Sequence, residues 1–166
     1  MSALIRNGRI EADDFAVLAD DQTFPEGRKV IISLARWQAE AVLHQAKNLI
    51  VGVHLPNTVS VDELWPILQS APLVLLEFPA FGDGRAYSQA RTLRDRYGYS
   101  GEIRAFGGAV VRDQLQAMQR CGIDAFVLRQ DQDPQRCLDA FKDFSIAYQR
   151  AADRMPLVAS LRRRTR

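Results

Sequence analysis

Short apolar segments alternate with stretches of helical composition along most of the chain, and this alternation is the strongest constraint on its fold. Five apolar segments follow one another after Lys29, at about 30–34, 50–55, 73–78, 102–106 and 125–129. They are near-continuous runs of Val, Ile, Leu and Phe, which is typical of strands buried on both faces of a parallel sheet. The pattern therefore predicts an α/β fold built on a five-stranded parallel βα-repeat sheet.

Two arrangements of such a sheet are compatible with the sequence: an open, doubly wound sheet and an incomplete (β/α) barrel. A complete barrel takes roughly 250 residues, whereas this chain has 166. The unit that runs from Gly101 through a helix to Val127 resembles the strand–helix–strand units of many barrels, and it favours the barrel-like arrangement. In either case we expect a functional site beyond the C-terminal ends of the strands.

Helices are expected after these strands, at about 37–47, 61–69, 85–97, 110–120 and 133–152. Two of them have recognisable starts. Ser60 followed by Glu63 forms a capping-box pattern. Asp133 followed by Pro134 fits an N-cap and a first helical position. Both signals predict where the helix begins.

The two ends of the chain differ from this repeating middle. Residues 1–29 are expected to form a β extension, because Asn7-Gly8 between apolar residues predicts a hairpin, and 15–18 is a further candidate strand. We expect the hairpin to cap an edge of the sheet or to join a dimer interface, since an incomplete barrel leaves open edges. Residues 153–166 are predicted to form a basic tail. The whole chain, 1–166, is interpreted as a single α/β domain.

Composition limits the classes of function. A net charge of +2 argues against a dedicated nucleic-acid binder, and no apolar run approaches the roughly 18 residues of a membrane span. Two cysteines, Cys121 and Cys137, are too few by themselves for a structural zinc site and too far apart for a redox pair. The only histidines are His44 and His54, so the sequence has no His-rich metal constellation. We therefore expect a cytoplasmic protein with no nucleic-acid or membrane partner, no metal site and no recognisable cofactor motif.

The first candidate site follows the third predicted strand, where two glycines flank an acidic residue. Gly82 and Gly84 allow positive φ, so that the backbone can turn sharply around Asp83. Free N–H groups at the start of the next helix favour an anion, and arginine side chains would add charge-assisted contacts. The alternative is a structural role, in which Asp83 caps the helix and the arginines are solvated. The proposed ligand-binding residues are Asp83, Gly84, Arg85, Ser88 and Arg91.

The second candidate site follows the fourth predicted strand. Gly107 and Gly108 would allow a ligand to approach the backbone closely, as at the phosphate sites of barrels, although a tight turn explains paired glycines as well. Because the C-terminal ends of parallel strands share one rim, we expect this loop and the first one to face a single cleft. The proposed ligand-binding residues here are Arg104, Gly107, Asp113 and Gln114.

Four motifs in this region carry a resemblance to a known family. They are F-P-x-F-x-D-G-R-x-Y-S-x-A-R-x-L-R over 78–94, Y-x-G-E-I-R-A-x-G over 99–107, R-D-Q over 112–114 and R-C-G-I-D-A-F over 120–126. Motifs of this length and order are similar to those of the bacterial family called domain of unknown function 934. The likeness is dense over about 49–128, and the segment 108–111 departs from the family pattern because it is more apolar.

The resemblance implies a place in metabolism. Members of that family are usually encoded beside sulfite reductase and are described as oxidoreductases involved in sulfite reduction. The resemblance therefore implies a place in assimilatory sulfite reduction and leaves the molecular role open. The first hypothesis is an accessory protein that partners sulfite reductase or its electron carrier and needs no catalytic residues of its own. The residues by themselves leave two alternatives: a protein or enzyme for a small oxyanion such as sulfite, sulfate or a sulfonucleotide, and a barrel-like phosphosugar enzyme.

Overall fold

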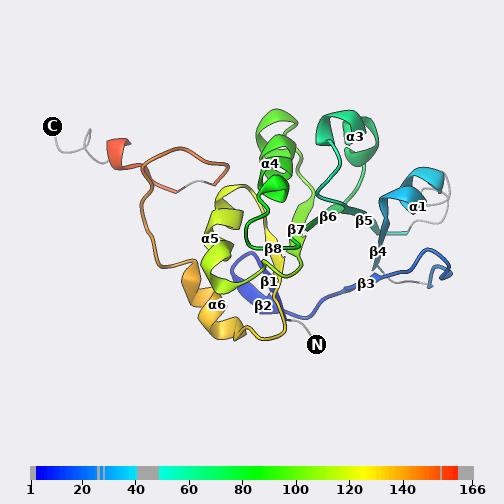
Figure 1. Cartoon of the computed structure of the whole chain (residues 1–166), viewed down its shortest axis with the longest axis horizontal. Helices are drawn as coiled ribbons and strands as arrows, with labels where there is room; N and C mark the ends of the chain where they lie inside the picture. Colours follow the sequence, from blue (N-terminus) through cyan, green and yellow to red (C-terminus); the bar gives the residue numbers. More distant parts are fainter. Residues whose placement is uncertain (1–2, 26, 28, 41–48, 154, 161–166) are drawn as a thin grey trace.

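One curled, eight-stranded sheet organises the chain (Figure 1). The structure is a computed structural model that describes residues 3–25, 27, 29–40, 49–153 and 155–160. In chain order the strands are β1 Leu4–Arg6, β2 Arg9–Glu11, β3 Phe15–Val17, β4 Lys29–Ser33, β5 Val51–Leu55, β6 Leu73–Glu77, β7 Glu102–Phe106 and β8 Ala125–Val127. Their spatial order is β2-β1-β8-β7-β6-β5-β4-β3.

The strand order decides between the two predicted arrangements. Strands β3 to β8 pair in parallel, and each lies beside its neighbour in the chain. A doubly wound sheet reverses its order at a switch point, whereas this order runs in one direction and the sheet curls into a half-barrel. The predicted α/β class is confirmed, but the sheet has eight strands rather than the predicted five. The extension contributes three further strands, two of them antiparallel.

The two faces of the half-barrel bury different residues. On the outer face, residues such as Val53, Val74 and Leu76 form the main core with the helices. On the inner face, Ile31 and Leu75 belong to a much smaller apolar cluster. Because side chains alternate along a strand, the polar residues that share the parity of this smaller cluster also point into the curl.

The N-terminal hairpin forms as predicted and lengthens one edge of the sheet. Asn7 and Gly8 both have positive φ, 50° and 74°, which suits the two-residue turn that matches strand twist. Strand β1 then pairs antiparallel with β8, and Leu4 and Ile5 are buried there. The hairpin is therefore part of the sheet rather than a separate element.

The helices cover the outer face and differ from the predicted spans in several places. Ser60 is the N-cap of its helix, but its side chain makes no capping hydrogen bond, so the capping-box prediction is wrong. The predicted helix over 85–97 changes after Arg91 into a π-helical segment. Part of the predicted span 37–47 lies outside the described residues. The helices are α1 Leu34–Ala39, α3 Val61–Leu68, α4 Arg85–Arg91, η1 Thr92–Arg96, α5 Arg112–Arg120 and α6 Pro134–Ala140.

The last helix is much shorter than predicted. Asp133 caps it through hydrogen bonds from the backbone N–H groups of Gln135 and Arg136, yet the helix ends at Ala140. Beyond it, the chain makes tertiary bonds instead: the N–H of Ala152 donates to the carbonyl of Arg120 at 3.0 Å. Contacts with the end of α5 therefore replace the helical bonds that local composition favours.

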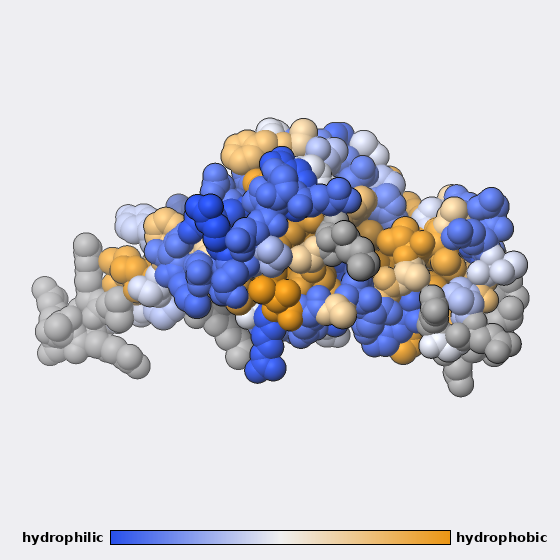
Figure 2. All heavy atoms as spheres, turned by 90° about the horizontal axis from the view of Figure 1, so that it is seen from below, coloured by the Kyte–Doolittle hydropathy of each residue, from blue (hydrophilic) through white to orange (hydrophobic). Residues whose placement is uncertain are grey.

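One face of the molecule is largely polar (Figure 2). Figure 2 shows charged and polar side chains over much of one face, with smaller apolar areas between them. Large apolar side chains are exposed at separate places along the chain: Ile10, Val17, Ile50, Phe81, Phe144, Ile146 and Tyr148. In the described ranges, no helix combines the length and apolarity that crossing a bilayer requires.

Candidate functional site

The loop between β6 and α4 is built around Asp83. Its carboxylate accepts hydrogen bonds from the Nε and Nη2 atoms of Arg85, at 3.0 and 2.6 Å. Asn57, which is buried at the end of β5, donates to the same carboxylate at 2.8 Å. The backbone N–H of Asp83 also donates to the carbonyl of Ala80 at 3.0 Å. Side-chain bonds from two directions therefore fix this loop.

The charges in this loop stabilise one another. The hydrogen bond from the Arg85 guanidinium holds the pKa of the Asp83 carboxyl well below its usual range, and the same bond raises the pKa of Arg85. Asp83 thus orients Arg85. Neither Gly82 nor Gly84 has positive φ, so the sharp turn expected from two left-handed glycines is not how the loop forms.

The loop after β7 lies directly against the loop after β6. Gly107 has a φ of 117°, and a side chain there would collide with the carbonyl oxygen of Phe78. The N–H of Ala109 donates to that carbonyl at 3.0 Å. The hydroxyl of Tyr87 on α4 donates to the side-chain oxygen of Gln114 on α5, and burial raises the pKa of Tyr87 to about 12. The close approach at Gly107 is thus made by the protein's own backbone.

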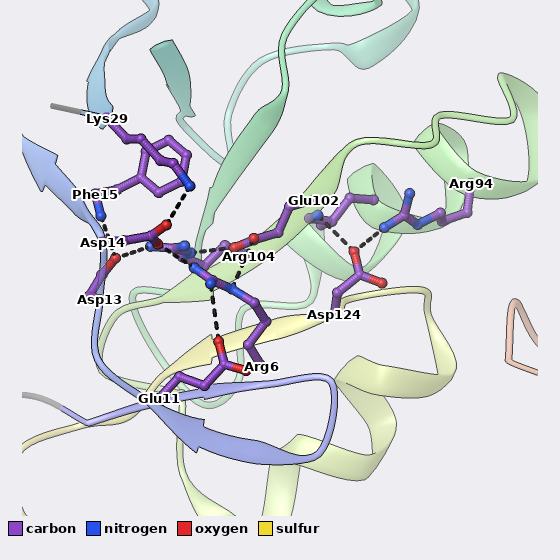
Figure 3. A network of polar contacts seen from close by, with 11 residues as sticks. Arg6, Glu11, Asp13, Asp14, Phe15, Lys29, Arg94, Glu102, Arg104 and Asp124 are labelled. Atoms are coloured by element: carbon purple, nitrogen blue, oxygen red, sulfur yellow. Dashed lines mark hydrogen bonds and ion pairs between the residues drawn. The ribbon is translucent and has the colours of Figure 1, made fainter. Parts of the chain in front are cut away.

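Arg104 lies inside the half-barrel. Its side chain is fully buried and donates to Glu102 and to Asp13, each at 2.7 Å. Figure 3 shows these residues converging from the N-terminal extension and β7, with Arg6 joining the same network. Arg6 bridges Glu102 at 3.1 Å and Asp14 at 2.8 Å. This network ties the N-terminal extension to the sheet.

The electrostatics of this network favour the ionised form of Asp14. Burial works to raise the pKa of Asp14, but hydrogen bonds from Lys29 and Arg6 outweigh it and hold that pKa far below its usual range. The ring of Phe15 lies over the Arg104 guanidinium at 5.2 Å. One guanidinium nitrogen of Arg104, Nη2, is buried without a hydrogen-bond partner among the described residues.

The remaining predicted residues lie on the outer surface. Arg91 pairs with Asp95 along its own helix at 2.5 Å, and Asp113 is exposed, 3.9 Å from Arg112. Ser88 lines a cavity together with Arg85. The structure therefore brings together Asp83, Arg85 and Ser88. Gly107 lies against Phe78 after β6, and Gln114 is bonded to Tyr87 on α4. Arg91, Arg104 and Asp113 each have other partners.

A row of polar residues at the strand ends was not identified from the sequence. Ser33, His54 and Glu77 lie near the C-terminal ends of β4, β5 and β6, on the inner face of the curl. Ser33 and His54 are direct neighbours in the sheet register. Each is a polar residue near the end of an otherwise apolar strand. Because such a residue is costly to bury, this pattern could have predicted the row.

His54 lies beside a carboxylate and an aromatic ring. Its Nε2 atom lies 3.8 Å from a carboxylate oxygen of Glu77, and Phe106 packs edge-on against the ring at 4.9 Å. Burial lowers the pKa of His54, against the opposing effect of Glu77. A neutral imidazole beside a carboxylate can accept a proton, and both side chains are about one-third exposed, 30% and 35%.

Comparison with known sequences identifies the family. The sequence model of a family of bacterial proteins of unknown function, DUF934, matches residues 52–158. The chain belongs to this family. No curated protein matches the chain significantly.

The DUF934 match covers the candidate loops but not the whole sheet. It begins in β5 and continues through α6, so it includes His54, Asp83, Arg85 and Gly107. Strands β1 to β4 lie before it. Among the residues that the structure describes, no group of three or more His, Cys, Asp or Glu side chains is arranged to hold a metal ion.

Proposed function

We propose that this DUF934 protein is an accessory protein of assimilatory sulfite reduction that binds sulfite reductase or its electron carrier. The pathway rests on the family resemblance of the sequence motifs. The binding role is supported by the way the arginines are used. Arg91 and Arg104 were expected to help bind an oxyanion, and both are instead paired with carboxylates of their own chain.

The observation that carries the proposal is the exposed ring of Phe81. Its residue is 67% exposed, and it follows β6 on the loop that Asp83 holds in place. Aromatic side chains on a preorganised surface are frequent anchors of protein interfaces. Arg85, at the other end of the loop, adds a cation that is exposed to solvent. An aromatic ring and a fixed ion pair on one loop suit a protein partner with both apolar and acidic groups.

Two further properties belong to the proposal. We infer that the protein is a homodimer, because the curled sheet ends in short outer strands. We also infer that it is cytoplasmic, since Cys121 and Cys137 are both free thiols, and free thiols suit a reducing compartment.

Affinity capture from sulfate-grown cells tests the partner. The tagged wild-type protein should retain sulfite reductase or its electron donor, and Phe81→Ser should lose it. Phe144→Ser is the matched control, because Phe144 is 64% exposed on a different segment. Equal capture by wild type and Phe81→Ser would reject this loop as the docking site.

Growth tests the pathway. A strain without this protein should grow poorly on sulfate as the sole sulfur source and recover when cysteine is supplied. Normal growth on sulfate, in a genome with no second copy, would reject the assignment to sulfite reduction.

A further inference from the structure

A polar cavity of about 290 Å³ lies between α3 and α4, on the outer side of the sheet. Its walls come from the β5–α3 loop, the start of α3 and one face of α4. Arg85, Ser88, Gln89 and Thr92 share that face at helical spacing. Further polar lining comes from Asn57, Ser60 and Asp62. This cavity is distinct from the cleft that the sequence predicted, since neither Arg104 nor Asp113 lines it.

The cavity is rich in hydrogen-bond donors. Ser60 is an N-cap whose hydroxyl makes no bond to its helix, whereas Ser33 and Asp133 both use their side chains for capping. The first-turn N–H groups of α3 have no intrahelical partners and carry partial positive charge. Asp83 binds the Nε and Nη2 atoms of Arg85, which leaves Nη1 of the guanidinium for a ligand.

The one carboxylate in the lining is already neutralised. Asp62 accepts a hydrogen bond from Arg96 at 2.9 Å and another from the Tyr97 hydroxyl at 2.7 Å. Both of its oxygens are used in this way, one by each partner. Its repulsion of an incoming anion is therefore weakened, and the hydroxyl and guanidinium donors face the cavity without a competing free acceptor on that wall.

Gln89 supplies the observation that specifies the ligand. The residue is 6% exposed, and its amide nitrogen donates to the carbonyls of Pro56 and Val59 at 2.8 and 3.0 Å. Those bonds fix which atom is the oxygen. That oxygen, Oε1, is buried and has no hydrogen-bond partner among the described residues. A buried acceptor without a partner is unfavourable, and a ligand with a hydroxyl group would satisfy it.

We propose that this cavity binds a small oxyanion that also carries a hydroxyl group, the oxyanion oxygens accepting from Arg85, Ser88 and Ser60 and the hydroxyl donating to Gln89. Inorganic phosphate is the simplest such ligand, because it keeps at least one proton at pH 7. Sulfate has nearly the same shape and no proton to donate. A site with a buried acceptor discriminates strongly against an analogue that lacks the matching donor. The site shares Arg85 with the proposed docking loop, but it is tested separately, because phosphate binding needs no protein partner.

Calorimetric titration at pH 7 and low ionic strength tests the site with phosphate and sulfate as probes. We expect phosphate to bind at least tenfold more tightly than sulfate. Arg85→Gln should weaken phosphate binding at least tenfold, since a charge-assisted contact is lost. Arg91→Gln is the matched control: Arg91 lies on the same helix in a comparable ion pair but not in the cavity, and its loss should change binding less than threefold.

Ser88→Ala provides a second variant, which removes a donor without disturbing the ion pair with Asp83, and it should also weaken phosphate binding. Melting temperatures, compared across all variants, show that the fold is retained. Equal affinity for phosphate and sulfate, no detectable binding of either, or equal losses in Arg85→Gln and Arg91→Gln would each overturn the proposal.

Discussion

Gly107 and Gly84 follow neighbouring strands, but only Gly107 has a backbone conformation and surroundings that exclude a side chain. Gly107 combines a φ of 117° with a clash between any added Cβ and the Phe78 carbonyl. Gly84 has a φ of −89°, and a Cβ there meets no atom within 4 Å. We predict that Gly107→Ala lowers the free energy of unfolding by about 1–3 kcal/mol. Gly84→Ala should change it by less than about 1 kcal/mol.

Urea denaturation of both variants measures this difference at one temperature. The comparison separates two glycines that look equivalent as candidate ligand-binding residues in the sequence. If Gly84→Ala proved as destabilising as Gly107→Ala, the loop after β6 would require a backbone that the described geometry does not have.

His54 offers a test of the inner rim by pH. Because burial disfavours the charged imidazole, we predict that its pKa in the folded protein lies below the usual value of about 6.5. Glu77 acts in the opposite direction, so Glu77→Gln should lower the pKa further. Proton NMR titration of the ring measures both values, and His44→Gln assigns the two histidine signals.

The sign of the effect on stability follows from this shift. Between the folded pKa and about 6.5, the unfolded chain binds this proton more readily than the folded chain, so the fold loses stability as the pH falls through that window. His54→Gln should remove the part of this stability loss that comes from protonation of His54. A folded pKa above 6.5, or a rise in Glu77→Gln, would contradict the arrangement of these two side chains.

Helix starts are features of whole elements, and two of them make a matched pair. Asp133 caps α6 with two hydrogen bonds, at 2.8 and 3.1 Å. Ser60 begins α3 without any side-chain capping bond. We predict that Asp133→Ala lowers the free energy of unfolding by about 0.5–2 kcal/mol. Ser60→Ala should lower it by less than about 0.5 kcal/mol. Thermal unfolding of both variants in buffer without phosphate compares them, and similar losses would contradict the assignment of the caps.

Elements differ in how well the sequence determines them. Buried parallel strands are mostly apolar, so all five predicted strands occur within a few residues of their predicted positions. The predicted length of the last helix was wrong because the chain after Ala140 bonds to the end of α5 instead. A contact between distant segments leaves no local signal in the sequence. The change from α-helix to π-helix at Thr92 also leaves no local signal in the sequence.

Ligand-binding residues were harder to place than strands. Asp83 and Arg85 meet within one turn, because they are only two residues apart. The sequence cannot indicate that Arg104 is held by Asp13, which is 91 residues away. The parity of Arg104 along β7 does show which face it occupies, once the curl of the sheet is known.

At the scale of the whole molecule, a half-barrel leaves its inner face and its two outer strands to be covered by other groups. Away from the C-terminal ends of the strands, Arg104, Phe15 and their carboxylate partners fill the inner face. The end nearer the strand C-termini presents Ser33, His54 and Glu77 instead. The extension thus closes one end of the curl and leaves the other accessible, as expected for a scaffold with its functional groups at the strand ends.

The outer strands of the sheet predict how two chains would associate. β2 carries Arg9 and Glu11 on either side of Ile10, and charged residues protect an edge strand from pairing. β3 is the other outer strand, and its residues are Phe15, Ala16 and Val17, without a charge. Val17 is 69% exposed. The β3 edge is therefore the surface that a second copy would cover, in a two-fold arrangement that pairs the two β3 strands.

We predict a dimer at micromolar concentration in multi-angle light scattering. Val17→Lys should shift the measured mass towards that of the monomer, because each chain would bring a lysine into the interface, where its charge would be desolvated. Phe144→Lys is the control, since it places the same charge on an equally exposed apolar residue far from β3 in the chain, and it should leave the mass unchanged. A monomeric wild-type protein, or a Val17→Lys variant that stays fully dimeric, would show that the β3 edge is not the interface.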